Sequence, residues 1–151
     1  MEAIYMKKLA LILIVVMAVT FVTACTGDIE IEDGTYRAEY ADFDAKGYKD
    51  FVEVTFEGGV VTRVVADGIS GKDGSLKSDS EAYKEEMESI AGTYPEKYYT
   101  DLINQYLANP DADYVDTVAG ATESSESFVV LLKALEKAIR TGYTDTVIVE
   151  R

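Results

Sequence analysis

The sequence predicts a small α+β domain, with an antiparallel sheet of about three to four strands packed with about three helices. The first half of the body alternates apolar and polar residues, as half-buried strands do, whereas the second half carries apolar residues at helical spacing. With 48% hydrophobic and 28% charged residues, the composition is typical of a folded globular chain. We expect a single domain over residues 34–142 of the 151-residue chain.

The N-terminus is predicted to be a cleaved secretory signal. Lys7 and Lys8 precede an apolar run over residues 9–22, which is shorter than the roughly 20 residues that a transmembrane helix needs. Small residues then lead to Cys25, the sole cysteine, and this arrangement resembles the lipobox of bacterial lipoproteins. The resemblance implies that residues 1–24 are removed and that acyl chains on Cys25 anchor the protein in the lipid bilayer. The alternative is an ordinary signal with an incidental cysteine.

The strands are expected after a short polar tether, which with the lipidated cysteine covers residues 25–33. Alternation of apolar and polar side chains predicts strands over residues 34–41, 51–57 and 60–66. Gly58 and Gly59 are typical of a hairpin turn, in which positive φ angles are needed. We therefore expect a three-stranded antiparallel sheet with one exposed face. The tail over residues 143–151 holds either a short edge strand at 146–149 or no ordered element.

The segment over residues 67–77 has the composition of a loop. A calcium loop is excluded because Asp67, Ile69 and Gly71 do not supply alternating oxygen ligands. We therefore expect a surface turn.

Three helices are predicted from caps and apolar spacing, over residues 78–91, 93–109 and 123–140. The first two begin with the capping-box sequences Ser78-Asp79-Ser80-Glu81 and Thr93-Tyr94-Pro95-Glu96. Gly92 and Gly142 are expected to end the first and the third helix, and Pro110 follows the second.

Charge and composition exclude several functions. The chain has 14 basic and 28 acidic residues, and a net charge of -14 repels the phosphates of DNA and RNA, so no nucleic-acid partner is expected. The absence of histidine, with one cysteine, excludes the usual Cys/His zinc sites and every triad that needs an imidazole. We assign neither a metal site nor catalytic residues, and no acidic pair stands out as an acid and base.

The most informative segment precedes the third helix and reads Asp-Thr-Val-Ala-Gly-Ala-Thr-Glu-Ser-Ser over residues 116–125. Its small residues form a turn that places the hydroxyl of Thr122 at a helix N-terminus, where free N–H groups and the helix dipole favour an anion. No Arg or Lys stands near the motif before Lys133, so charge alone is not expected to hold an anion there. The alternative is that Thr122 merely caps the helix.

This segment resembles the flavinylation motif of the FMN-binding domain family. The family includes the covalent-flavin subunits of Na⁺-pumping NADH:quinone reductases and Rnf complexes, and membrane-anchored flavoproteins of Gram-positive extracellular electron transfer. The likeness extends over about residues 33–140 and is closest to the lipoprotein branch. Further matching segments are Gly34-Thr35-Tyr36, Gly47-Tyr48-Lys49-Asp50, Gly58-Gly59, Leu76-Lys77-Ser78-Asp79 with Tyr83 and Met87, and Phe128.

The resemblance implies that Thr122 carries FMN through a phosphoester. A separate flavin transferase would make this bond from FAD with Mg²⁺ and release AMP. Asp116, Gly120 and Ala121 match the motif, and Asp116 is as easily a residue for the transferase as for the finished site. Ala119 departs from the motif, where a Ser or Thr is common, and this removes one possible hydrogen bond to the phosphate.

The resemblance also implies a lipid-anchored electron carrier on the extracytoplasmic face of the cell membrane, reduced by a membrane NADH or quinone oxidoreductase, rather than a stand-alone enzyme. The alternatives are a cofactor-free surface lipoprotein of the same fold, such as an adhesin or accessory module, and a flavin reductase with its own substrate. Several tyrosines are candidates for stacking on the flavin ring, and each is equally a core residue: Tyr36, Tyr83, Tyr98, Tyr106 and Tyr114.

Overall fold

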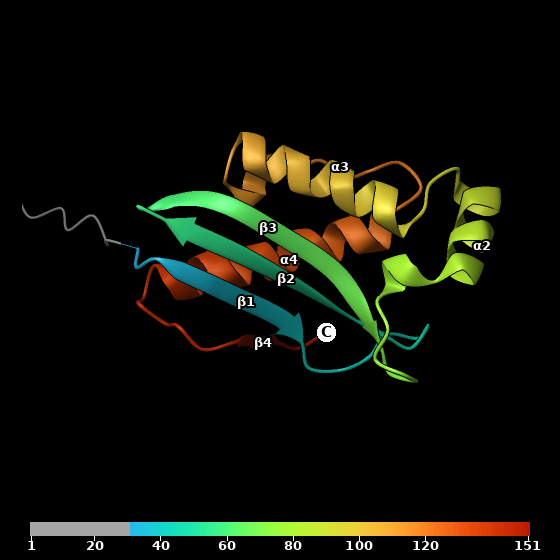
Figure 1. Cartoon of the computed structure of the whole chain (residues 1–151), viewed down its shortest axis with the longest axis horizontal. Coiled ribbons are helices and arrows are strands. Elements are labelled where there is room, and N and C mark those ends of the chain that lie inside the picture. Colours follow the sequence, from blue (N-terminus) through green and yellow to red (C-terminus); the bar gives the residue numbers. More distant parts are fainter. Residues whose placement is uncertain (1–30) are drawn as a thin grey trace, which may run out of the picture.

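The computed structural model describes residues 31–151, which form the predicted α+β fold. A sheet of four strands has the order β3-β2-β1-β4, and helices α3 and α4 lie on one of its faces (Figure 1). The strands are β1 (Gly34–Tyr40), β2 (Tyr48–Glu57), β3 (Val60–Ser70) and β4 (Val147–Val149). The predicted signal peptide, Cys25 and most of the tether lie outside the described residues.

The central hairpin confirms the sequence prediction. Strands β2 and β3 pair antiparallel, and Gly58 and Gly59 turn the chain at φ angles of 61° and 75°, a region that favours glycine. Strand β1 pairs antiparallel with β2, with Ala38 opposite Val52. Strand β4, by contrast, pairs parallel with the other edge of β1, so the sheet is mixed rather than purely antiparallel. Of the two alternatives for the tail, the edge strand is the one that forms.

The predicted surface turn over residues 67–77 is wrong in part. Strand β3 continues to Ser70, and both Asp67 and Lys77 are buried, with exposed fractions of 4% and 3%. Asp67 is buried because it accepts hydrogen bonds from the backbone N–H and the hydroxyl of Ser78. The hydrogen bonds from Ser78 thus offset part of the cost of burying the Asp67 carboxylate, which composition assigns to the surface.

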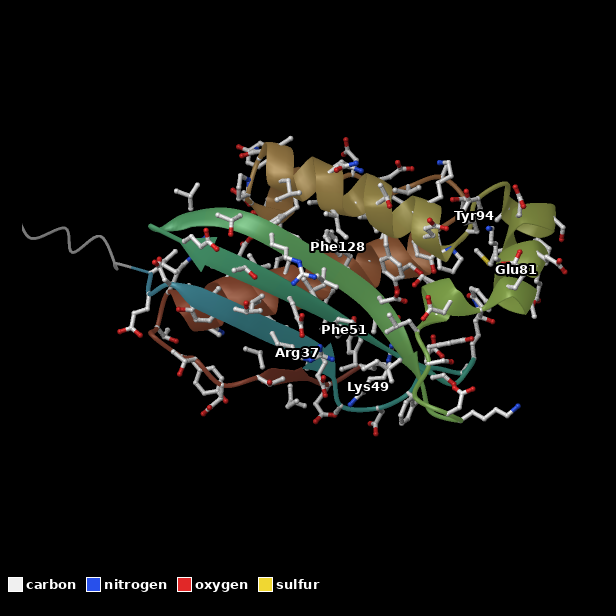
Figure 2. All side chains as sticks on the ribbon, viewed as in Figure 1. Arg37, Lys49, Phe51, Glu81, Tyr94 and Phe128 are labelled. Carbon is white, nitrogen blue, oxygen red and sulfur yellow. The ribbon has the colours of Figure 1, made fainter. Side chains whose placement is uncertain are left out.

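The helices are α2 (Glu81–Ala91), α3 (Pro95–Ala108) and α4 (Thr122–Ile139), with single 3₁₀ turns η1 (Lys77–Asp79) and η2 (Ala112–Tyr114). Helices α3 and α4 bury apolar faces against the sheet, and Phe128 of α4 is 1% exposed in this core (Figure 2). Helix α2 buries none of its residues and projects beyond the end of the sheet (Figure 1). Within residues 31–151, no helix has the length and apolar character needed to cross a membrane.

The starts of the first two helices differ from the predicted capping boxes. Ser80, rather than Ser78, caps α2, and its hydroxyl accepts a hydrogen bond from the N–H of Tyr83 at 3.3 Å. Tyr94, rather than Thr93, is the N-cap of α3. Thr93 is instead buried, and its hydroxyl has no hydrogen-bond partner among residues 31–151.

The open face of the sheet carries an ion-pair network. Arg37 contacts Glu39 at 2.8 Å and Glu53 at 2.7 Å, and Lys49 contacts Glu39 at 2.8 Å. The guanidinium of Arg37 also lies 4.0 Å from the ring centroid of Phe51, which explains why this outward aromatic side chain is only 6% exposed (Figure 2). The charges of Arg37, Glu39, Lys49 and Glu53 on this face are therefore paired with one another.

We expect the protein to lose stability at alkaline pH because of three of its buried tyrosines. Burial raises the pKa of Tyr98, Tyr99 and Tyr106, and the negative charges of Asp50 and Glu136 add to this for Tyr99 and Tyr106 respectively. The three protonated side chains contribute fully to the free energy of unfolding below the pKa of about 10 that tyrosine has in the unfolded chain. This contribution is lost as the pH rises toward the higher pKa values of the folded protein. We expect the free energy of unfolding in urea to fall by about 1.4 kcal/mol per pH unit for each tyrosine above that point.

The variant Tyr98→Phe is the control for this prediction. It is expected to reduce the alkaline slope by about 1.4 kcal/mol per pH unit, because one of the tyrosines with a raised pKa is removed. At neutral pH it should be at least as stable as the wild type, since the Tyr98 hydroxyl is buried without a hydrogen-bond partner in the described part of the chain. An unchanged slope in the variant would show that these tyrosines do not control alkaline stability.

Candidate functional site

A groove of about 900 Å³ opens where α2, the loop between β1 and β2, and the N-terminus of α4 come together. Small-molecule sites in proteins typically enclose about 300–1,000 Å³, so the groove has room for a ligand of cofactor size. Helix α2 forms one wall because it projects past the sheet instead of packing on it.

Thr122 lines this groove as the first residue of α4 and is exposed. It does not cap the helix, because the N-cap is Ala121, which makes no side-chain capping bond. The first helical bond runs from the N–H of Ser125 to the carbonyl of Ala121 at 2.9 Å, which leaves the N–H groups of residues 122–124 without helical partners. The arrangement presents a hydroxyl beside an anion-binding helix end, and the capping alternative is wrong.

Gly120 holds the motif against the end of α2. Its φ angle is +79°, and a Cβ atom there would lie 2.5 Å from the carbonyl oxygen of Ala91. Ser125 fixes the other side of the turn, since its hydroxyl donates to the carbonyl of Ala121 at 2.8 Å and accepts from the N–H of Val118 at 3.1 Å. Gly120 and Ala121 therefore shape the backbone on which Thr122 is presented.

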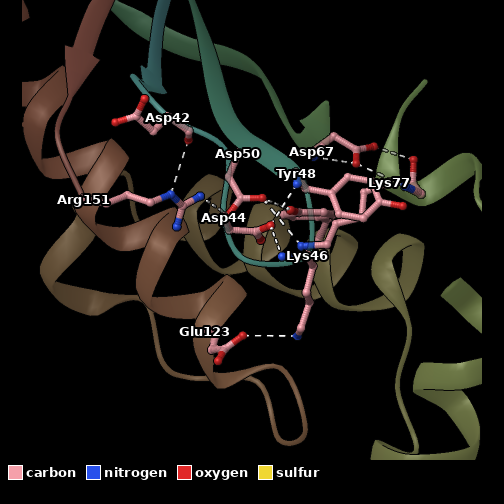
Figure 3. Close-up of polar contacts among 12 residues, drawn as sticks. Asp42, Asp44, Lys46, Tyr48, Asp50, Asp67, Lys77, Glu123 and Arg151 are labelled. Carbon is pink, nitrogen blue, oxygen red and sulfur yellow. Dashed lines mark hydrogen bonds and ion pairs between the residues drawn. The ribbon is translucent and has the colours of Figure 1, made fainter. Parts of the chain in front are cut away.

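Lys46 corrects the expectation that no basic residue lies near the motif. It comes from the loop between β1 and β2, and its ammonium lies 3.2 Å from the carboxylate of Glu123, directly after Thr122 (Figure 3). Partial burial lowers the pKa of Lys46, but the hydrogen bond with Glu123 and the nearby Tyr83 outweigh this effect and raise it. Lys46 is therefore a charged ammonium at the groove, invisible in sequence because it lies so far from the motif.

The floor of the groove contains further charges. Asp50 of β2 faces Lys77 of η1 and Arg151, with an ion-pair distance of 3.6 Å to each (Figure 3). The guanidinium of Arg151 also lies 3.9 Å from the ring centroid of Tyr40. Among residues 31–151, no group of three or more His, Cys, Asp or Glu side chains is placed to hold a metal ion.

Part of the rim of the groove is apolar. It includes Phe43, Ile90 and Val130, which are 49%, 76% and 43% exposed, and Met87 adds a thioether from α2. Exposed apolar side chains gathered around a concave site typically mark a ligand-binding surface.

The candidate tyrosines differ in whether they line the groove. Tyr83 lines the groove, and so does Tyr40, which the sequence did not single out. The others do not line it: Tyr36, Tyr98 and Tyr106 belong to the core, and Tyr114 is 67% exposed on η2.

Asp116 does not line the groove. It is exposed, and its backbone is held by Gln105 through two hydrogen bonds, one of 2.7 Å from its N–H and one of 3.3 Å to its carbonyl. Its carboxylate is therefore on the outer surface of the motif rather than in the groove.

No model of a known protein family matches the chain. Over 118 residues, however, it is 43% identical to the 15 kDa lipoprotein of Treponema pallidum (strain Nichols), a match that spans 78% of this chain and 83% of that protein. The chain belongs to the family of this 15 kDa lipoprotein. Among solved structures, the CPE2226 protein from Clostridium perfringens is similar, with a TM-score of 0.75 and 27% identity, covering 80% of this chain and 98% of that one.

Proposed function

We propose that this member of the 15 kDa lipoprotein family is a membrane-anchored flavoprotein that carries FMN on Thr122 and transfers electrons. The observation that carries the proposal is the position of Thr122: its hydroxyl is exposed at a helix N-terminus, is not used for capping, and opens onto a groove of about 900 Å³. The resemblance of residues 116–125 to a flavinylation motif supports FMN as the group that this hydroxyl carries.

The residues of the groove fit the two parts of FMN. The N–H groups of residues 122–124 and the ammonium of Lys46 are suited to a phosphate. The apolar rim formed by Phe43, Met87 and Ile90 is suited to a flat, largely apolar ring. Bound FMN supplies the redox chemistry, whereas the chain supplies position, partial exclusion of water and electrostatics.

Attachment is a group transfer without change of oxidation state. The Thr122 oxygen forms a bond to the FMN phosphorus of FAD while the pyrophosphate bond of FAD breaks. AMP leaves with the bridging oxygen, and the hydroxyl proton passes to solvent. A flavin transferase with Mg²⁺ would catalyse this step, and the exposed Asp116 outside the groove is suited to contact that enzyme rather than the bound cofactor.

The proposed electron carrier would lie on the extracytoplasmic face, between a membrane NADH or quinone oxidoreductase and an external or membrane acceptor. The experiment that tests the cofactor is to produce residues 26–151 with and without a flavin transferase, FAD and Mg²⁺. We expect an added mass of FMN less one water, and a fluorescent band on a denaturing gel, only with the transferase. Unmodified protein under conditions in which a known substrate of the transferase is flavinylated would instead support the cofactor-free lipoprotein.

Lys46 is predicted to contribute to binding of the phosphate. In protein made without the transferase, Lys46→Ala should weaken binding of free FMN by about two- to fivefold, the effect expected of a half-exposed ion pair. Riboflavin, which lacks the phosphate, should bind the variant and the wild type equally in a flavin-fluorescence titration. Lys97→Ala is the matched control, because Lys97 forms an exposed pair with Asp101 away from the groove. Equal losses for FMN and riboflavin would contradict a phosphate contact.

Anchoring is predicted to depend on Cys25, which lies outside the described residues. The relative is named a lipoprotein, and this supports the interpretation of Cys25 as the acylated residue. Cys25→Ser should move the protein from the detergent phase to the aqueous phase in a detergent-partition assay. The reason is that two acyl chains hold such a protein stably on a bilayer. A variant that still partitions into detergent would show that another segment provides the anchor.

A further inference from the structure

The charged floor of the groove has unsatisfied hydrogen-bonding capacity. The Asp50 and Lys77 side chains are 6% and 3% exposed, and their ion pair of 3.6 Å is longer than a hydrogen bond. Within residues 31–151, the Lys77 ammonium has no hydrogen-bond partner, although it lines the groove. The ammonium is open to the groove, so an acceptor bound there would give it the hydrogen bond that the described residues do not supply.

The backbone is shaped to admit this pair. Gly68 of β3 lies beneath it, and a Cβ atom there would be 2.9 Å from Oδ1 of Asp50 and 3.2 Å from Cδ of Lys77. The ammonium is also flanked by the rings of Tyr48 and Tyr83, with centroids at 5.3 and 5.5 Å. Lys77 is therefore held in place by packing against the two tyrosine rings and Gly68, and its ion pair with Asp50 leaves its hydrogen-bond donors free within residues 31–151.

The three charged groups present donors and an acceptor in a fixed order. Asp50 lies between Lys77 at Oδ1 and Arg151 at Oδ2 (Figure 3), and its Oδ1 also accepts a hydrogen bond from the Tyr99 hydroxyl at 3.3 Å. The charged groups of the floor therefore follow the order cation donor, carboxylate acceptor, cation donor. Arg151 keeps donors available, because the described residues give its guanidinium only one hydrogen bond, from Nε to the carbonyl of Asp42 at 3.5 Å. A phosphate or carboxylate would face the negative charge of Asp50, whereas an imide edge, with an N–H between two carbonyls, is complementary.

We propose that Asp50, Lys77 and Arg151 recognise the imide edge of the flavin ring, with Asp50 accepting from the ring N3–H and the two cations donating to the flanking carbonyls. This inference rests on the proposed function, since the ring reaches the groove through FMN on Thr122. It assigns the floor a separate role from the helix end: the helix end holds the phosphate, and the floor selects the heterocycle.

The test uses the flavinylated protein with ¹⁵N-labelled FMN and measures solvent exchange of the ring N3–H by NMR. Exchange in the wild type should be slower than in free FMN by about tenfold, which corresponds to about 1.4 kcal/mol. Arg151→Gln and Lys77→Met should each speed this exchange, whereas Arg63→Gln, on an exposed residue of β3 outside the groove, should leave it unchanged.

The outcomes separate the two proposals. Intact mass reports attachment, so a missing FMN adduct overturns the proposed function and this inference with it. An adduct whose N3–H exchanges as fast as that of free FMN overturns the inference alone. If Lys77→Met does not fold, the wild type and Arg151→Gln still decide, because the Arg151 side chain is 31% exposed and its loss leaves the Asp50–Lys77 pair in place.

Discussion

Replacing Thr122 by alanine is expected to abolish covalent flavin attachment completely. The effect is all-or-none because the hydroxyl oxygen is the atom that would form the bond to phosphorus, and the nearby Ser124, which also lines the groove, is only 9% exposed. Stability should change little, since Thr122 is exposed and does not cap the helix. The measurement is intact mass and in-gel flavin fluorescence after co-production with a flavin transferase.

Two further variants sharpen this result. Thr122→Ser keeps a hydroxyl and should retain attachment, which separates loss of the nucleophile from a disturbed turn. Thr117→Ala changes an exposed threonine of the same segment that does not line the groove, so its adduct should equal that of the wild type. An adduct that survives in Thr122→Ala would place the flavin elsewhere, and loss in Thr117→Ala would assign recognition to the wider segment.

Gly120→Ala is expected to destabilise the fold by about 2–4 kcal/mol, a large effect for a single methyl group. A residue with φ of +79° costs about 1 kcal/mol when it is not glycine. The added Cβ would also lie 2.5 Å from the Ala91 carbonyl oxygen and 3.1 Å from the Thr93 methyl, so the turn and the end of α2 must separate. Urea unfolding should therefore show a lower midpoint, and the wall of the groove should loosen.

Gly74→Ala isolates the backbone part of this effect. Gly74 has a φ angle of +76°, and a Cβ atom there would meet nothing within 4 Å. It should therefore cost only the conformational term, about 1 kcal/mol. Equal losses in the two variants would show that the contact between Gly120 and Ala91 contributes nothing, and that the motif is not held against α2.

The local pattern of apolar residues was sufficient to predict the hairpin and the two helices that form the core. Alternation identified the β2–β3 hairpin, and helical spacing identified the faces of α3 and α4 that form the core. Residues that pair over long distances were missed, because composition alone places Asp67 and Lys77 in a surface turn although both are buried. The N-cap of α3 was misplaced for a similar reason, since tertiary packing buries the Thr93 side chain.

The motif could be found in the sequence, whereas the groove around it could not. Thr122 and Gly120 stand in one short segment, and their local geometry follows from it. The groove also needs Lys46, Lys77 and Arg151, which come from three separate parts of the chain. The β1–β2 loop supplies Lys46 and η1 supplies Lys77, and the parallel pairing of β4 with β1 brings Arg151 to the same site.

The most direct test is the mass of the peptide that contains Thr122, taken from protein purified from the membranes of its native host. We expect this peptide to carry FMN less one water, with fragmentation that places the addition on the Thr122 side chain. An unmodified Thr122 peptide from flavin-replete cells, with other flavinylated proteins of the same host carrying their cofactor, would contradict it.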